Sequence, residues 1–367
     1  MDLKTKTWCA AAASALLFMG SAHAQSYTFK DLNQSAISST ARGINNLGQI
    51  VGDARNAGNA SSHATLWNGA STTDLGTLGG LYSGATAINS NGQISGTAAW
   101  FDYYTVAAVW QPGSGTAQSL ASGTLSGALA INNSGQLAGW MAGPSGSPLA
   151  TTWTGGTATA LTTLGGTTSF ANGINDHGVA VGFSNLAGDA ASHATMWSGG
   201  TVTDLGTLGG TASYAQAINN NGQIVGASRS ADKGNMHATL WDGNAIIDLG
   251  SLGGDGGWAS AINNRGQIVG SSNLANAYIQ HATLWNDGKV IDLNAFIDNS
   301  ASAAGWVLTD AWGINDQGAI VGGARNLLTG EDHAFLLSVS AVPEPSTYAM
   351  LMLGLGLIGL TKSRRKS

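Results

Sequence analysis

Charged residues are scarce in this chain of 367 residues, of which only 9% are Asp, Glu, Lys or Arg. When the chain ends (1–24 and 342–367) are left out, acidic side chains outnumber basic ones by about ten, and the basic residues form no cluster. Nucleic-acid binding depends on clustered Lys and Arg, so this composition argues against DNA or RNA as a partner. Because the only cysteine is Cys9, we expect neither disulfides nor thiolate metal ligands in the region that follows it.

Catalytic signatures are also lacking. The sequence contains no G-x-S-x-G elbow, H-E-x-x-H pair or P-loop. Glycoside hydrolysis needs two placed carboxylates, one of them often Glu, yet Glu331 is the only Glu between residues 25 and 341. We therefore expect a protein that is not an enzyme and needs no cofactor. The alternative is a glycan-active propeller enzyme that uses loop carboxylates such as Asp102 or Asp310.

The first 24 residues have the three parts of a secretory signal peptide. Two lysines precede an apolar run at residues 8–20, and Ala22-His23-Ala24 fits an A-x-A cleavage site. The apolar run is short for a membrane span. We expect cleavage after Ala24, which also removes Cys9.

The C-terminal 26 residues, 342–367, carry three features in a fixed order: Val342, Pro343, Glu344 and Pro345, then an apolar run at 348–360, then a basic tail. This order resembles the PEP-CTERM sorting signal. The resemblance implies a Gram-negative bacterium that makes an exopolysaccharide, and an exosortase that recognises Pro343-Glu344-Pro345 and removes the anchor. We therefore expect an exosortase as processing partner, membrane contact only through residues 348–360 before processing, and a product at the cell surface or outside the cell.

Between these ends, a unit of three phrases recurs. The first phrase, I-N-x-x-G-Q or a variant, begins at Ile44, Ile88, Ile131, Ile174, Ile218, Ile262 and Ile314. It is typical of a β-hairpin, because Asn tolerates left-handed geometry and Gly accepts positive φ. The second phrase is H-A-T-L-W, and the third is D-L-G followed by a Leu-Gly-Gly turn.

Four short strands in about 44 residues are the size of a propeller blade. The seventh unit ends after its third strand, whereas the chain begins with a strand-like segment, 27–33, that matches the fourth strand at 290–294. We therefore predict an all-β, seven-bladed β-propeller over residues 25–341, with the last blade closed by the N-terminal strand. Such closure leaves no open sheet edge at the ends of the array.

The three phrases together resemble the HAF family of extracellular repeats, named for a His-Ala-Phe sequence that stands here as His333-Ala334-Phe335. The resemblance covers nearly all of residues 30–340. It implies an exported, often surface-associated protein and brings no settled activity.

Three residue types recur at fixed repeat positions: His, Asp and Trp. Equivalent His residues on neighbouring blades are too far apart to share a metal ion unless they line the channel, so we expect no metal site from His63, His193, His237, His281 and His333. We expect these side chains to bond a backbone carbonyl or turn, and the Asp of D-L-G to accept a turn or inter-blade hydrogen bond. The Trp of each H-A-T-L-W phrase is expected to pack the blades.

Aromatic residues that interrupt the repeat are better candidates for function, because irregular segments on a rigid scaffold tend to carry it. The candidate ligand-binding residues are Trp100, Phe101, Tyr103, Tyr104, Trp140, Trp306 and Trp312; Trp258 precedes the sixth hairpin in a similar way. Exposed rings beside Asp and Asn could stack on sugars, and the alternative is that they fill gaps between blades. The sequence thus predicts an exported, non-enzymatic binding or scaffold protein associated with exopolysaccharide or biofilm.

Overall fold

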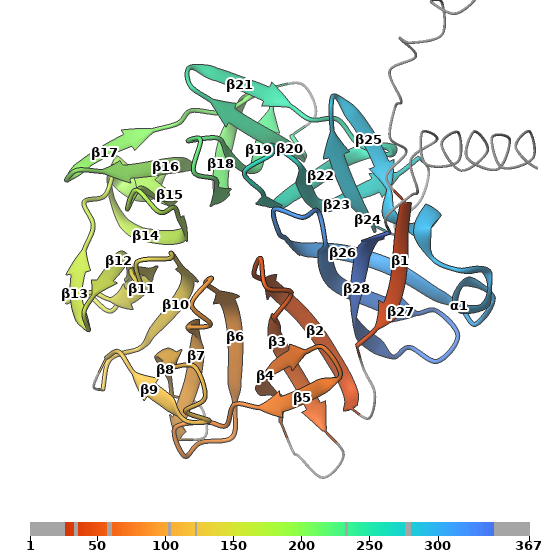
Figure 1. Ribbon diagram of the computed structural model, residues 1–367. Helices are drawn as coiled ribbons and strands as arrows, with labels where there is room; N and C mark the ends of the chain where they lie inside the picture. Colours follow the sequence, from red (N-terminus) through yellow and green to blue (C-terminus); the bar gives the residue numbers. More distant parts are fainter. Residues whose placement is uncertain are drawn as a thin grey trace, which may run out of the picture. The chain divides into compact units, whose positions relative to one another are not determined.

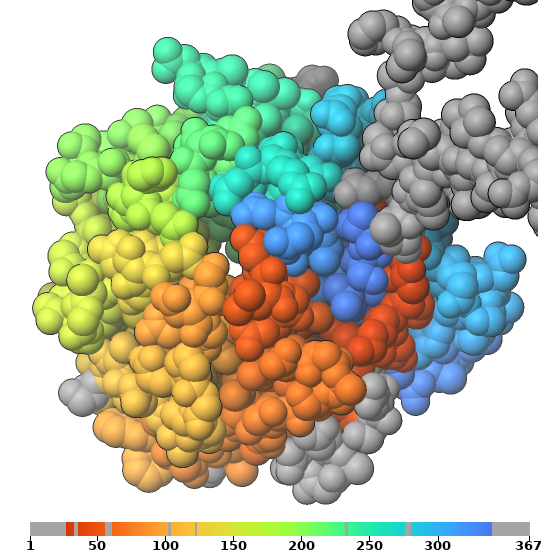
Figure 2. All heavy atoms as spheres, viewed as in Figure 1, coloured from red at the N-terminus to blue at the C-terminus, as the bar shows by residue number. Residues whose placement is uncertain are grey.

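In the computed structural model the described residues are 26–32, 36–56, 61–101, 104–121, 123–231, 234–275 and 280–340. Tyr27–Val339 form one compact unit, built from seven four-stranded antiparallel sheets arranged as a ring (Figure 1). The space-filling view shows the ring hollowed at its centre (Figure 2). The predicted all-β, seven-bladed propeller is confirmed. The predicted cleavage at Ala24, the sorting motif and the anchor segment lie outside the described residues.

The first two strands of each blade form the hairpin that the Ile-Asn phrase predicts. The first strands, in blade order, are β2 (Ala36–Ile44), β6 (Ser83–Ile88), β10 (Ser126–Ile131), β14 (Gly165–Ile174), β18 (Gly209–Ile218), β22 (Gly253–Ile262) and β26 (Trp306–Ile314). The second strands are β3 (Ile50–Asn56), β7 (Ile94–Phe101), β11 (Leu137–Ala142), β15 (Ala180–Leu186), β19 (Ile224–Ser230), β23 (Ile268–Leu274) and β27 (Ile320–Asn326).

The outer two strands carry the other phrases. The third strands are β4 (His63–Asn68), β8 (Tyr104–Trp110), β12 (Pro148–Thr154), β16 (Ser192–Ser198), β20 (Met236–Asp242), β24 (Gln280–Asn286) and β28 (Asp332–Ser340). The fourth strands are β5 (Ser71–Asp74), β9 (Ala117–Ser119), β13 (Thr157–Ala160), β17 (Thr201–Asp204), β21 (Ala245–Asp248), β25 (Lys289–Asp292) and β1 (Ser26–Asp31).

In the described part of the chain, helices are few and short: η1 (Ala187–Asp189), η2 (Leu293–Phe296) and α1 (Asn299–Ala303). The last two lie in the longer connection before β26, where the repeat spacing expands. Of the helices in the described ranges, none has the length and apolar character to cross a bilayer.

The ring closes between the two ends of the propeller, as predicted. The seventh sheet has the strand order β1-β28-β27-β26, so the N-terminal strand is the fourth strand of the last blade (Figure 1). Next to this strand, the Leu32 N–H donates to the Ala334 carbonyl at 2.9 Å. The closure covers the edge of β28, which would otherwise present unpaired backbone groups.

Two positions in each hairpin require glycine, for different physical reasons. Gly222, in the turn of the fifth blade, has φ +84°, a conformation that L side chains rarely adopt. Gly226, three residues after the phrase, lies so close to the first strand that a Cβ would stand 2.0 Å from the Tyr214 carbonyl oxygen. The phrase is therefore fixed by turn geometry and by close backbone approach.

The hydrophobic core lies between blades, where the repeated tryptophans pack as predicted. Each is at most 4% exposed: Trp67, Trp110, Trp153, Trp197, Trp241 and Trp285. Trp197 of the fourth blade packs with Ala138 and Ala150 of the third, and its Nε1–H donates to the Thr162 carbonyl at 2.7 Å. Each such tryptophan stabilises the contact with the preceding blade.

The repeated histidines have a different partner from the one expected. His63 Nδ1 lies 2.8 Å from Asp74 Oδ2, on the fourth strand of the same blade, and the same contact recurs at His193, His237, His281 and His333. Because an ionised carboxylate can only accept, the Nδ1 atom carries the proton. Asp74 also accepts from the Gly76 N–H at 2.8 Å, which is the predicted turn role.

Candidate functional site at the central channel

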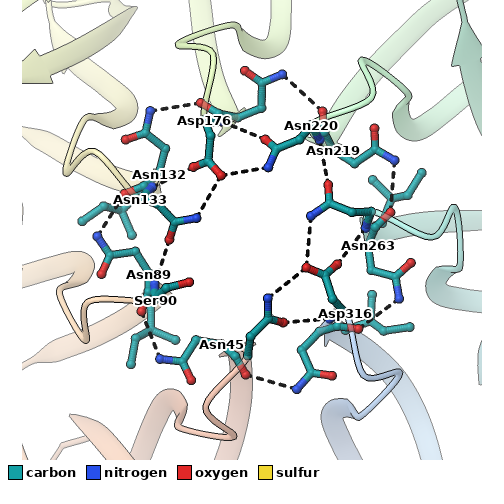
Figure 3. A pocket seen from close by; sticks show the side chains of 18 of the residues that line it. Asn45, Asn89, Ser90, Asn132, Asn133, Asp176, Asn219, Asn220, Asn263 and Asp316 are labelled. Atoms are coloured by element: carbon teal, nitrogen blue, oxygen red, sulfur yellow. Dashed lines mark hydrogen bonds between the residues drawn. The ribbon is translucent and has the colours of Figure 1, made fainter.

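One end of the channel is built by the first Asn of each hairpin phrase, a set that we name the asparagine ring: Asn45, Asn89, Asn132, Asn175, Asn219, Asn263 and Asn315. Each Nδ2 donates to the backbone carbonyl of its counterpart on the next blade, at 2.9–3.2 Å (Figure 3). The last step joins Asn315 to Asn45 at 3.1 Å and closes the ring. The hairpin turn thus connects the blades as well as folding each one.

Each asparagine is also held within its own turn. Asn219 is only 4% exposed, and its Oδ1 accepts from the N–H groups of Asn221 and Gln223, both at 3.0 Å. Its Nδ2 donates to the Gln223 side chain at 2.9 Å as well as to the next blade. All of its polar capacity is used by the protein, so the ring is structural.

The residue after each ring asparagine forms the channel rim, where two aspartates stand among asparagines. Asp176 Oδ2 accepts from the side chains of Asn133 and Asn220, on the two neighbouring blades, at 2.9 and 2.8 Å. Asp316 does the same with Asn264 and Asn46, at 3.1 and 2.9 Å (Figure 3). Each carboxylate therefore bridges three blades.

The rim lowers the pKa of both carboxyls. Burial raises the pKa of Asp176, but hydrogen bonds from Asn133 and Asn220 and the charge of His177 outweigh it and hold that pKa below 3.8. The pKa of Asp316 is lowered in the same way, with burial opposed by hydrogen bonds from Asn264 and Asn46 and by the charge of Arg265. The mouth enclosed here has a volume of about 230 Å³. In the described part of the chain, no three His, Cys, Asp or Glu residues converge to hold a metal ion.

Below the hairpins, a β-bulge in every blade directs one side chain toward the channel. Two residues before the hairpin Ile of each blade, the register of the first and second strands shifts around one unpaired residue. We name these seven residues the bulge ring: Arg42, Thr86, Leu129, Asn172, Gln216, Ser260 and Trp312. All seven line a chamber of about 340 Å³. A bulge redirects a side chain without interrupting the sheet. Seven similar blades therefore present seven different side chains to the chamber.

Farther from the hairpins, aromatic side chains form a continuous series over blades three to six, which we name the aromatic arc: Trp140, Phe170, Phe183, Tyr214 and Trp258. Successive ring centroids are 5.6, 5.1, 5.0 and 6.0 Å apart. All five rings are half-buried. Strand register explains the alignment of the five rings. One position on the first strands β14, β18 and β22 carries three of them, and the position paired with it on the second strands β11 and β15 carries the other two.

The arc ends at a groove between the sixth and seventh blades. This groove has a volume of about 340 Å³ and is lined by Gln216, Trp258, Ser260, Ser271, Gln280, Asp310 and Trp312. It shares Gln216, Ser260 and Trp312 with the chamber, so the two cavities adjoin. Pockets of this size with flat apolar walls and a few polar groups are suited to small ligands.

The structure does not bring the predicted ligand-binding residues together. Trp140 belongs to the aromatic arc and Trp312 to the groove. Trp306 packs against His333, with ring centroids 4.2 Å apart, and against the core of the seventh blade. A third group stands at the turn between β7 and β8, where Trp100, Phe101 and Tyr104 are 38%, 74% and 61% exposed; Tyr103 and the alternative catalytic Asp102 lie outside the described residues.

Sequence reasoning missed Phe170, Phe183 and Tyr214. A signal was present, since Phe170, Tyr214 and Trp258 each stand four residues before the hairpin Ile of their blade. Phe183 gave no such signal, because it reaches the arc only through its pairing with Phe170 across the hairpin.

Comparisons with known proteins identify the C-terminal segment. Residues 341–366 match the family model of the PEP-CTERM protein-sorting motif, which confirms the predicted signal. No curated protein matches the chain. One similar solved structure is TolB from Acinetobacter baumannii, with a TM-score of 0.46 and 12% identity over 79% of this chain and 63% of that one. Another is a putative TolB from Agrobacterium tumefaciens, with a TM-score of 0.41 and 15% identity over 71% of this chain and 87% of that one.

A third similar structure is a mutant of AofleA from Arthrobotrys oligospora, with a TM-score of 0.37 and 12% identity over 73% of this chain and 90% of that one. The chain spans less than two thirds of the Acinetobacter TolB. The sorting-motif match implies that this propeller is an extracellular protein sorted by an exosortase in a Gram-negative bacterium, with transient anchoring in the membrane.

Proposed function

We propose that this protein is a non-enzymatic glycan-binding protein of the cell surface or extracellular matrix, associated with exopolysaccharide. The observation that carries the proposal is the aromatic arc, in which five half-buried rings lie in contact across four blades. Sugar rings have apolar faces that stack on flat aromatic surfaces, while their hydroxyls bond nearby polar groups.

The fold itself does not require the arc. At the register position of Phe170, Tyr214 and Trp258, the first blade has Thr40 and the second has Gly84. Because these blades are otherwise built alike, a small residue is sufficient there for packing. The clustering of large rings on one side of the ring is therefore better explained by a ligand than by stability.

Export supports the same proposal. The PEP-CTERM match places the chain among proteins handled by an exosortase, and the resemblance of its repeats to the HAF family fits a surface protein. The sugar polymers outside such a cell have the apolar ring faces that the aromatic arc is suited to bind.

The groove favours binding over catalysis. Asp310 is the only carboxylate among the described residues that line it, whereas glycoside hydrolysis uses two carboxyl groups about 5–9 Å apart. A hydrolysis assay on the same glycans tests the enzymatic alternative: turnover by the wild type that Asp310→Asn abolishes would replace our proposal.

The direct test is retention of the protein on immobilised exopolysaccharide from the producing bacterium. We expect Phe183→Ala and Tyr214→Ala to weaken retention at least fivefold, and Phe101→Ala, at the exposed β7–β8 turn, to leave it unchanged. Melting temperatures show whether the variants fold. Retention that survives in both folded arc variants, or that falls only in Phe101→Ala, would refute the arc as the binding surface.

A further inference from the structure

The two tryptophans that wall the groove are each supported from behind. Tyr214 stacks on Trp258 with centroids 6.0 Å apart and planes 24° apart. Arg42 lies over the Trp312 ring, with its guanidinium carbon 6.0 Å from the ring centroid. Each indole therefore has a protein group against one side, and both rings line the groove.

The support of Trp312 is itself held in place. Arg42 Nε donates to Asp53 Oδ1 at 3.1 Å, and Asp53 pairs with Thr40 in the hairpin of the first blade. The ion pair and the cation–π contact restrict the indole before any ligand enters. A wall fixed in advance loses little conformational entropy on binding.

Three polar side chains that line the groove have no partner among the described residues. Within the described ranges, the side chains of Gln216, Ser260 and Asp310 make no hydrogen bond or ion pair. Half-buried polar groups usually find partners, so these three are available to a ligand. Together they offer an amide, a hydroxyl and a carboxylate beside two flat apolar walls.

The charge in the groove decides which sugars fit. The Asp310 carboxylate can only accept hydrogen bonds, and it suits the hydroxyls of a neutral sugar. A uronic acid would bring a second carboxylate beside it, and like charges at short range repel. Arg42 does not offset this charge, because it is paired with Asp53.

We propose that the groove between the sixth and seventh blades is a subsite for one neutral pyranose unit, clamped between Trp258 and Trp312, with its hydroxyls bonded by Asp310, Gln216 and Ser260. The inference rests on the proposed glycan-binding function and adds the position and the sugar class. The subsite selects neutral hexose chains against chains of uronic acids.

Tryptophan fluorescence titrations of the full chain test the subsite. The probes are neutral hexose oligosaccharides (gluco-, manno- and galacto-oligosaccharides) and two acidic ones (oligogalacturonate and oligoalginate). We expect at least one neutral probe to bind and to change the emission, and both acidic probes to bind at least tenfold more weakly. Trp258→Ala and Trp312→Ala should each weaken the neutral probe at least tenfold, and Asp310→Asn should reduce the discrimination to less than threefold.

Control variants distinguish a failure of the proposed subsite from a failure of the proposed glycan-binding function. Trp312→Phe keeps an aromatic wall and should retain most of the affinity, whereas a purely structural role would lower the melting temperature of both Trp312 variants and leave their affinities alike. If arc variants such as Phe183→Ala abolish binding while Trp258→Ala and Trp312→Ala do not, the subsite is refuted and the glycan-binding function stands. Acidic probes that bind the wild type as tightly as neutral ones also refute it. If no probe binds the wild type and the exopolysaccharide does not retain it, both proposals fail.

Discussion

His333 Nδ1 lies 2.8 Å from Asp31 Oδ2, although the two residues are 302 positions apart in the chain. In the first blade, the same 2.8 Å contact joins His63 and Asp74, only 11 positions apart. The N-terminal strand therefore supplies the seventh blade with the Asp that every complete repeat of this type carries on its fourth strand. Ring closure reproduces the side-chain contact of an unbroken blade as well as its backbone pairing.

Removal of residues 26–31 should strongly destabilise the propeller. The deletion uncovers the edge of β28 and removes the buried Tyr27, and losing one large core side chain alone costs about 3–5 kcal/mol. Denaturant unfolding measures the loss. Asp74→Asn is the matched control, because it weakens the equivalent contact in a blade continuous in sequence and should cost about 1 kcal/mol. A deletion variant as stable as the wild type would disprove the closure.

Tyr27→Phe should stabilise the protein slightly. The Tyr27 hydroxyl is buried, has no hydrogen-bond partner among the described residues, and has its pKa raised to about 12 by burial. Removing an unsatisfied polar group while keeping the ring, which lies 4.8 Å from Phe296 between centroids, should gain about 0.5–1 kcal/mol. The melting temperature should rise; a fall of several degrees would show that the hydroxyl has a partner.

Asn219→Ala should weaken both its turn and the contact with the next blade. The substitution removes four hydrogen bonds and leaves the buried Asn263 carbonyl with the Gly266 N–H of its own turn but no donor from the neighbouring blade, for a loss of about 2–4 kcal/mol. Asn221→Ala, in the same turn, removes one exposed bond to Asn264 and should cost less than about 1 kcal/mol. Equal losses in chemical denaturation would argue against the structural role of the asparagine ring.

The two rim aspartates should make the free energy of unfolding fall in acid. Both carboxyls have a folded-state pKa below the ordinary 3.8, so their contribution is complete above that value and is lost as the pH falls through the lowered pKa. Asp176→Asn/Asp316→Asn should be less stable than the wild type at pH 7, because its amides face other amide donors. The difference should narrow below pH 3, as melting curves at several pH values can show; a constant difference would rule out this linkage.

Two strand glycines should respond in opposite ways to alanine. In Gly226→Ala the new Cβ meets the Tyr214 carbonyl oxygen at 2.0 Å, so the hairpin must open at a cost above about 2 kcal/mol. In Gly84→Ala nothing lies within 4 Å of the new atom and φ is not positive, so stability should hold or improve. If Gly226→Ala folds with wild-type stability, the close approach does not constrain the phrase.

The fold was predictable because its signals repeat seven times. Ile, Asn and Gly recur at fixed distances, and each has a local cause: a buried position, a turn that the Asn side chain closes, and a backbone approach that excludes Cβ. The incomplete last unit, read together with the strand-like start of the chain, also indicated that the N-terminal strand closes the last blade.

The candidate site was less predictable, because it depends on contacts between blades. Trp140 and Trp312 were recognised as departures from the repeat, but only the ring geometry shows which irregular residues meet. The bulge that turns Trp312 toward the channel leaves no mark in the sequence. The His–Asp contact was missed for a related reason: strand register, and not residue spacing, places Asp74 beside His63.

Hydrogen–deuterium exchange of the protein with and without the exopolysaccharide tests the central claim most directly, because it locates the binding surface. We expect added protection in the first strands of blades four to seven, at residues 165–172, 209–216, 253–260 and 306–312, with none in the hairpin turns at 45–49 and 219–223. Protection confined to those turns, or to the β7–β8 turn around Phe101, would contradict a binding surface formed by the aromatic arc and the groove.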